Sequence, residues 1–149
     1  SYQDTSFNFK VLAMAHRVVY LPDAFVHYRL DNEASSVNQL DKVMYVSKEF
    51  AEIERYLTEK RLIWNLGGLM EWRKFMTYYW NLQRLTPKLA EKFSDVMRTE
   101  FKQAKKQGLL QKIYFNTREK LAYQLIMNGS KKQIGKLINL RKNLKYGAK

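Results

Sequence analysis

The polar side chains best suited to chemistry gather in two short stretches near the beginning of the chain. Asp4 belongs to the first stretch, and the second runs from His27 and Arg29 to Ser35 and Ser36. A carboxylate at the start of a helix is kept ionised by free backbone amides and the helix dipole, which suits a general base near neutral pH. The same position is that of an ordinary N-terminal cap, and spacing alone favours the cap.

The second stretch carries residue types that bind metals and phosphates. His27 and Arg29 lie two apart in an expected strand, so their side chains share a face. An imidazole ligates divalent ions and a guanidinium binds phosphate oxygens through two hydrogen bonds, which together suit a metal-bound diphosphate. Without a second metal ligand in the pattern, a partly buried strand histidine is the simpler interpretation. Ser35 and Ser36 precede an amphipathic helix and fit a cap equally well.

The elements that would position these residues are one helix and two strands. Phe7, Val11 and Met14 recur at helical spacing and predict a short helix. Residues 18–21 and 25–29 predict two strands on either side of the turn at Pro22-Asp23. Such a small set cannot bury its own faces, so the segment needs further neighbours to complete a sheet.

From residue 36 onward the pattern is helical and predicts a bundle. The first helix follows a capping sequence at Ser36 and Gln39, and its apolar stripe comprises Val43, Val46, Phe50, Ile53 and Leu57. The second has a bend or break at Gly67-Gly68 and a stripe of Leu62, Leu66, Leu69, Trp72, Phe75 or Met76, Tyr79 and Leu82.

Three further helices are marked by caps. One begins at Thr86-Pro87, ends near Gly108 and carries Leu89, Phe93, Met97, Phe101 and Ala104. The next opens with Asn116 and Glu119 and closes at Gly129. The last opens with Ser130 and Gln133, and its apolar residues are Ile134, Leu137, Ile138 and Leu144.

Two segments of the chain resemble the end of the catalytic domain of a bacterial family 2 glycosyltransferase. In that family an acidic motif with a later Phe opens a helix, a strand ending in Pro follows, and a Tyr-Arg strand leads to a Ser-rich turn. The matching residues here are Gln3-Asp4-Thr5-Ser6-Phe7, then Arg17 to Pro22, then His27-Tyr28-Arg29 and Ser35-Ser36. The order of these motifs is more specific than any one of them.

The resemblance implies a fold, a reaction and roles for the site residues. Residues 1–36 would be a helix–strand–strand remnant of a GT-A α/β catalytic domain, and residues 37–149 a helical accessory domain, so the fold class is mainly α. Asp4 would deprotonate the acceptor hydroxyl. His27 would lie near a divalent ion, Mg or Mn, and Arg29, Ser35 and Ser36 near the nucleotide-sugar donor. Gln3 departs from the family, which often has an acid there.

The resemblance also implies a glycan or lipid-linked acceptor, polysaccharide biosynthesis and a longer parent enzyme. The family's metal-binding Asp-x-Asp does not occur among the 149 residues. We therefore expect this chain to be a C-terminal fragment that transfers no sugar by itself.

Composition and charge limit the classes of chemistry and of binding partner that this chain can have. The absence of cysteine excludes disulfides and thiol chemistry, and no apolar run approaches the roughly 20 residues of a membrane span, so a cytoplasmic protein is expected. The net charge is +13, and residues 101–149 hold 13 basic residues against one acidic residue, Glu119. A basic, amphipathic final helix predicts contact with an anionic membrane surface, although a solvated face is equally compatible.

Two other functions stay open. A basic helical nucleic-acid-binding module would use aromatic residues such as Tyr114, Phe115 and Tyr123 for stacking, but no recognised motif supports it and aromatic residues at helical spacing usually form a core. An oligomerisation module is the third alternative.

Overall fold

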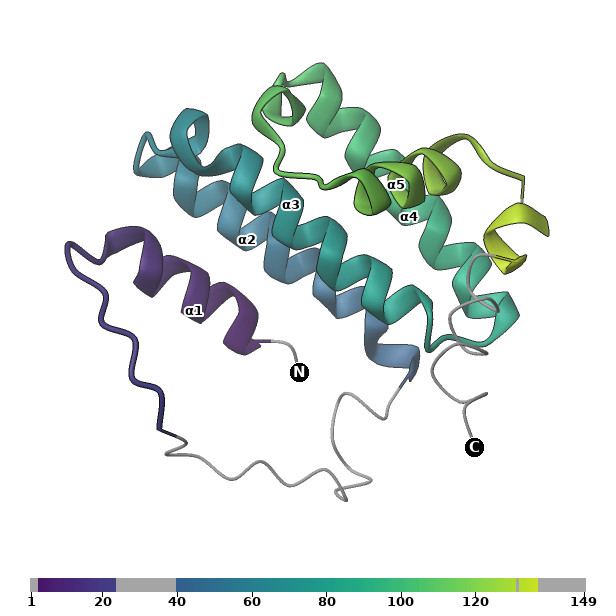
Figure 1. Ribbon diagram of the computed structural model, residues 1–149, viewed down its shortest axis with the longest axis horizontal. Coiled ribbons are helices and arrows are strands. Elements are labelled where there is room, and N and C mark those ends of the chain that lie inside the picture. The colour runs from purple at the N-terminus through teal and green to yellow at the C-terminus, as the bar shows by residue number, and fades with distance from the viewer. Residues whose placement is uncertain (1–2, 24–39, 131, 137–149) are drawn as a thin grey trace.

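Three long helices lie side by side in the computed structural model and form the body of the protein (Figure 1). They are α2 (Tyr45–Glu59), α3 (Ile63–Leu82) and α4 (Pro87–Lys106). α1 (Gln3–Met14) packs against α2, and α5 (Thr117–Asn128) packs against α4. The 3₁₀ helix η1 (Leu40–Met44) precedes α2, and η2 (Leu109–Lys112) follows α4 and lies against α3.

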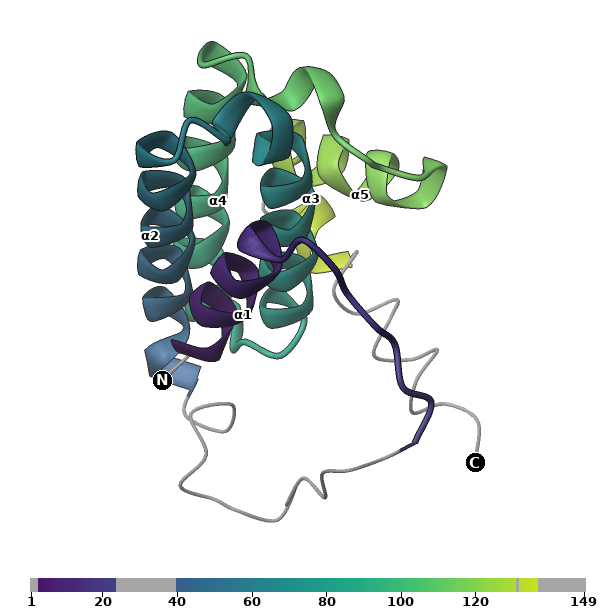
Figure 2. The same cartoon turned by 90° about the vertical axis from the view of Figure 1, so that its left-hand side faces the viewer.

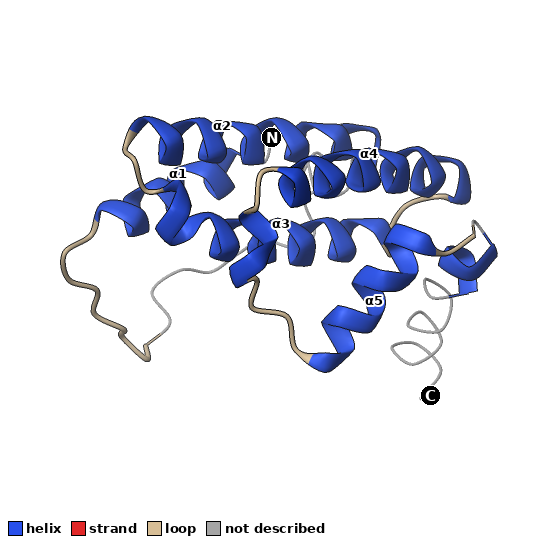
Figure 3. Ribbon diagram, turned by 90° about the horizontal axis from the view of Figure 1, so that it is seen from above, coloured by secondary structure: helices blue, strands red, loops and turns tan. Residues whose placement is uncertain are grey.

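The structure describes residues 3–23, 40–130 and 132–136. Within these ranges every regular element is helical, as Figure 3 shows by colour, and residues 132–136 add one more helical turn. The predicted helical bundle is therefore confirmed. No helix in this part of the chain is long and apolar enough to cross a membrane.

The core is made of apolar side chains from α2, α3 and α4. The stripe predicted for the first long helix is confirmed, because Val43, Val46, Phe50, Ile53 and Leu57 are each at most 1% exposed. α4 buries Phe93, Met97, Phe101 and Ala104, as its spacing predicts. Phe75 lies at the centre, with ring centroids 5.9 Å from Phe101 and 4.8 Å from Phe115. Burying a large apolar side chain contributes about 1.5–3 kcal/mol, so this cluster supplies much of the stability.

α3 differs from its prediction in two ways. Its buried face carries Glu71 and Lys74, whereas Leu69 of the predicted stripe is 39% exposed. The helix also continues through Gly67-Gly68 without a break. A Cβ added at Gly67 would lie 3.0 Å from Cδ2 of Leu109, so the small residue allows η2 to pack closely against α3. Gly67 therefore serves close packing, and the early break that the sequence offered as one alternative does not occur.

The predicted side-chain caps form at Asn116 and Ser130, whereas the one predicted at Ser36 and Gln39 lies outside the described residues. Thr86 has an extended backbone and Pro87 begins α4, although the Thr86 side chain makes no capping hydrogen bond. At α5 the Asn116 side chain accepts from the backbone N–H of Glu119 at 2.9 Å, and Glu119 accepts in return from the N–H of Asn116 at 3.0 Å. The reciprocal pair satisfies two amides that the helix leaves free.

The predicted cap at residue 130 also forms. The backbone N–H of Ser130 donates to Gln133 at 2.7 Å, and the N–H of Gln133 donates to Ser130 Oγ at 3.3 Å. Ile134 of the following turn is buried at 4% exposure, so the described part of this segment packs onto the bundle.

The N-terminal segment confirms one of its three predicted elements. Residues 3–14 form α1, but the strand predicted at residues 18–21 is wrong, because residues 17–22 have no regular structure. Figure 2 shows this segment leading away from the end of α1. A strand needs a neighbour for its backbone hydrogen bonds, and no other strand occurs in the described part of the chain. The second predicted strand, residues 25–29, lies outside the described residues.

Candidate functional site

Asp4 lies in the first turn of α1, and its side chain is exposed. Four backbone N–H groups at the start of any helix lack partners within the helix, and the dipole there favours negative charge. The structure thus places an accessible carboxylate at the start of a helix.

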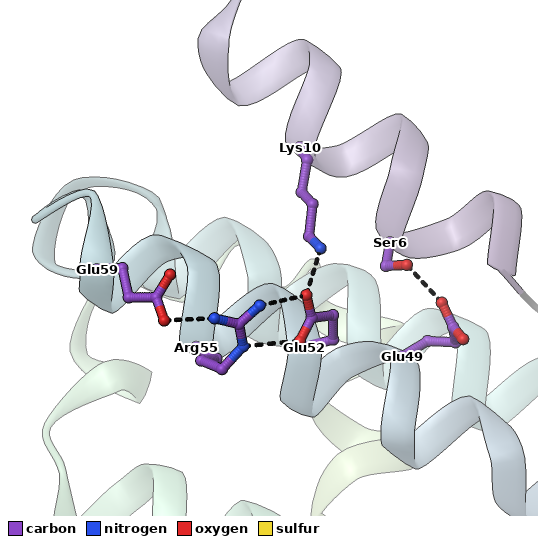
Figure 4. Close-up of polar contacts among 6 residues, drawn as sticks. All are labelled: Ser6, Lys10, Glu49, Glu52, Arg55 and Glu59. Carbon is purple, nitrogen blue, oxygen red and sulfur yellow. Dashed lines mark hydrogen bonds and ion pairs between the residues drawn. The ribbon is translucent and has the colours of Figure 1, made fainter.

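Polar contacts link α1 to α2, and Phe9 and Ala13 of α1 also pack against the core. Ser6 Oγ donates to Glu49 at 2.5 Å, and Lys10 Nζ forms an ion pair with Glu52 at 2.6 Å (Figure 4). Arg55 binds Glu52 through two nitrogens, at 2.7 and 2.8 Å. Arg55 and Lys10 together lower the pKa of Glu52 to about 2. These contacts set the position of α1, and with it that of Asp4.

Arg55 also pairs with Glu59 on its own helix, so one guanidinium bridges two carboxylates (Figure 4). Both carboxylates raise the pKa of Arg55. The arrangement holds Glu52 in place for Lys10. Because all these side chains are partly or largely exposed, each pair contributes little to stability and serves mainly to orient α1.

The opposite face of α1 is apolar and exposed. Phe7 is 66% exposed, and Val11, Leu12 and Met14 are also exposed. Residues 18–21, which are Val, Val, Tyr and Leu, are also all at least 60% exposed. We call these eight residues the outer apolar surface. So many large apolar side chains exposed within residues 7–21 are unusual for a folded domain.

The other predicted site residues, His27, Arg29, Ser35 and Ser36, lie outside the described residues. The structure therefore places Asp4 alone among the predicted set and does not test whether the others meet it. Within residues 3–23, 40–130 and 132–136, no three His, Asp or Glu side chains come together in a group that could hold a metal ion.

The sequence analysis missed a polar cluster buried between α2, α3 and α4. Lys74 Nζ lies 3.3 Å from both Glu71 Oε1 and Glu100 Oε2. Tyr78 donates to Glu100 Oε2 at 2.7 Å, and Ser47 of α2 donates to the other oxygen of the same carboxylate. Three helices are thus joined through one lysine and one carboxylate.

Glu71 is the unusual member of this cluster. Its side chain is 0% exposed, and among the described residues its Oε2 has no hydrogen-bond partner. Burial raises its pKa to about 7, with Glu54 and Glu100 adding to the rise and Lys74 opposing it. The same burial, together with Glu100, raises the pKa of Tyr78. The protonated and ionised forms of Glu71 are therefore present in similar amounts near neutral pH.

A pocket of about 280 Å³ adjoins this cluster, and Glu54, Glu71, Lys74 and Glu100 are among its lining residues. Since Glu71 and Lys74 are sealed from solvent, the cluster is a structural link between helices. One signal in the sequence would have revealed it: Glu71, Lys74 and Tyr78 follow each other at steps of three and four on the face that also carries Phe75.

No protein-family model matches the chain, and no curated protein or solved structure matches it either.

Proposed function

We propose that this chain is the C-terminal part of a glycosyltransferase that moves a sugar from a nucleotide-sugar donor to a glycan or lipid-linked acceptor. The observation that carries the proposal is the placement of Asp4, exposed in the first turn of α1, at the motif that resembles the acidic motif of family 2 enzymes. The role of Asp4 is to accept the proton of the acceptor hydroxyl.

The chemistry of this role follows from the reaction. The acceptor alcohol is a weak nucleophile, and it must lose its proton as its oxygen attacks the anomeric carbon of the donor. A carboxylate held at fixed distance takes that proton without the cost of bringing a base from solution. In the same proposal His27 and Arg29 face the diphosphate and its divalent ion, and Ser35 and Ser36 form the rim of the donor site.

The outer apolar surface supports the proposal independently of Asp4. It extends from Phe7 on α1 to residues 18–21, which is the segment expected to belong to an α/β domain. A sheet layer covering this surface would bury side chains that the helical bundle leaves exposed. α1 would then lie between the catalytic domain on its outer face and the bundle on its inner face.

The test is Asp4→Asn in the enzyme that contains this chain. Asparagine preserves the shape and removes the base, so we expect turnover to fall by about 10² or more. Asp23→Asn is the matched control, because Asp23 is an exposed aspartate in the same N-terminal segment, and its turnover should stay within about twofold of the parent enzyme. An unchanged rate for Asp4→Asn would remove Asp4 from the mechanism. The isolated 149-residue chain should show no transfer at all.

The positive charge of the last third supports a second role at a membrane surface. Residues 101–149 have a net charge of +12, and Lys132 and Lys136 are exposed. Because Ile134 is buried, we propose that this segment approaches anionic lipid through its lysines, at the inner face of the cell membrane. Co-sedimentation with vesicles containing anionic lipid should decrease as salt increases and be absent with neutral vesicles. Equal binding to both vesicle types, or to neither, would contradict this role.

A further inference from the structure

An exposed tryptophan lines a pocket at the end of the bundle where α3 begins and α4 ends. Trp64, in the first turn of α3, is 68% exposed. The pocket has a volume of about 370 Å³, and its lining includes Trp64, Lys106, Gln107, Gly108 and Gln111. This volume lies within the range of sites for small ligands, which is about 300–1,000 Å³.

Gly108 keeps the pocket open. Its φ of 79° is in the left-handed region, which a residue with a side chain adopts only with strain. A Cβ at this position would lie 3.6 Å from Nε2 of Gln111 and 4.0 Å from Cζ3 of Trp64. Any longer side chain would occupy the space between the indole and the amide. The turn from α4 to η2 therefore places both groups around one open volume.

The lining combines an aromatic ring with planar hydrogen-bonding groups. Trp64 offers an indole face, and Ile63 and Leu109 add apolar wall. Gln107 and Gln111 each carry one carbonyl acceptor and two N–H donors, and Lys106 adds three donors. None of the lining residues is acidic. The pocket is thus suited to a ligand that is neutral or negatively charged and has one apolar face and a hydroxylated edge.

A pyranose ring has this combination of surfaces. Its axial C–H groups form a weakly positive apolar face that packs on the negative face of an indole, while its hydroxyls both donate and accept hydrogen bonds. We propose that the Trp64 pocket binds a saccharide unit of a glycan. The identification of this glycan as the acceptor rests on the proposed function, whereas the binding itself does not.

The test is a titration of the 149-residue chain, labelled with ¹⁵N at its tryptophan indoles, with a panel of glycans. The probes are maltotriose, cellotriose, N-acetyllactosamine and an acidic trisaccharide, sialyllactose. Each is raised to about 50 mM, so that a site with a Kd of about 1 mM is saturated. We expect a saturable shift of the Trp64 indole N–H with at least one probe. No saturable shift with any of them would overturn the proposal.

Two variants assign the binding to this pocket. Trp64→Ala removes the stacking face and should weaken binding at least about tenfold. Trp80→Ala is the matched control, because Trp80 is the other exposed indole of α3, 44% exposed, and lies 4.2 Å from the guanidinium of Arg84. Its affinity should stay within about twofold of the parent chain. Equal weakening in both variants would overturn the assignment.

The outcome is separate from that of the Asp4 experiment, because the titration measures no turnover. Saturable binding together with an unaffected Asp4→Asn enzyme would keep the pocket and remove the proposed function. Full loss of turnover in Asp4→Asn without binding at Trp64 would keep the proposed function and remove the saccharide pocket.

Discussion

The buried carboxylate of Glu71 makes the stability of the bundle depend on pH. We expect Glu71→Gln to remove most of this dependence between pH 5 and pH 8. Glutamine has nearly the same shape, keeps an oxygen that accepts from Lys74, and carries no charge that must be desolvated. The substitution therefore isolates the cost of ionising this one group.

The magnitude follows from the pKa of about 7 in the folded protein against 4.5 for the free side chain. Between these two values the folded state retains a proton that the unfolded state has lost, so stability decreases as pH rises. Each pH unit in this interval lowers the free energy of unfolding by about 1.36 kcal/mol for one proton. Integrated from pH 5 to pH 8, Glu71 accounts for a loss of about 2–3 kcal/mol, which is a large part of the stability of a typical domain.

Urea unfolding of the two proteins at pH 5 and pH 8, followed by circular dichroism, measures the effect. The parent chain should lose about 2–3 kcal/mol more than Glu71→Gln over this range, with unchanged m values. Asp95→Asn, which alters a 63% exposed carboxylate on α4, should behave like the parent. The parent and Glu71→Gln share every other titratable group, so the difference between their profiles reports Glu71 alone. Parallel pH profiles for parent and Glu71→Gln would refute the reasoning.

Two further substitutions test the packing and the turns. Phe75→Ala should lower the free energy of unfolding by about 3–5 kcal/mol, because the ring is fully buried against other aromatic rings. Phe7→Ala is the control: its ring is 66% exposed, so the free energy of unfolding should change by less than about 0.5 kcal/mol. Equal effects would mean that the two rings are equally buried. Arg61→Gly should raise the free energy of unfolding by up to about 1 kcal/mol, because Arg61 has a φ of 57°, where glycine is unstrained. A destabilised variant would contradict the strained backbone at this position.

Local signals in the sequence predicted much of the bundle. The caps at Asn116 and Ser130 involve residues three apart, so their hydrogen bonds could be foreseen from spacing alone. The core faces of α2 and α4 were predicted correctly because each helix has a single apolar stripe. α3 is apolar around most of its circumference, so periodicity could not identify its inner face.

Non-local contacts account for what the sequence did not reveal. The spacing on α3 places Glu71 beside Lys74, but α4 brings Glu100 to the same lysine, and spacing within α3 does not encode that contact. Phe7, Val11 and Met14 do share a face of α1, as predicted, but spacing cannot tell which way that face points, and it points to solvent. In the candidate site, the position of Asp4 at a helix start could be predicted, whereas the Trp64 pocket depends on a turn 44 positions later at Gly108.

The two faces of α1 respond to salt in opposite directions. The inner face is fixed by Lys10, Ser6 and their glutamates, and a rise from 0.1 M to 1 M ionic strength shortens electrostatic screening from about 10 Å to about 3 Å. The outer apolar surface is affected mainly by the kind of salt, because sulfate and phosphate favour burial of such groups. Sodium chloride should thus weaken the ion pair of the inner face while Phe9 and Ala13 keep α1 packed on the core, whereas ammonium sulfate should favour association through the exposed side.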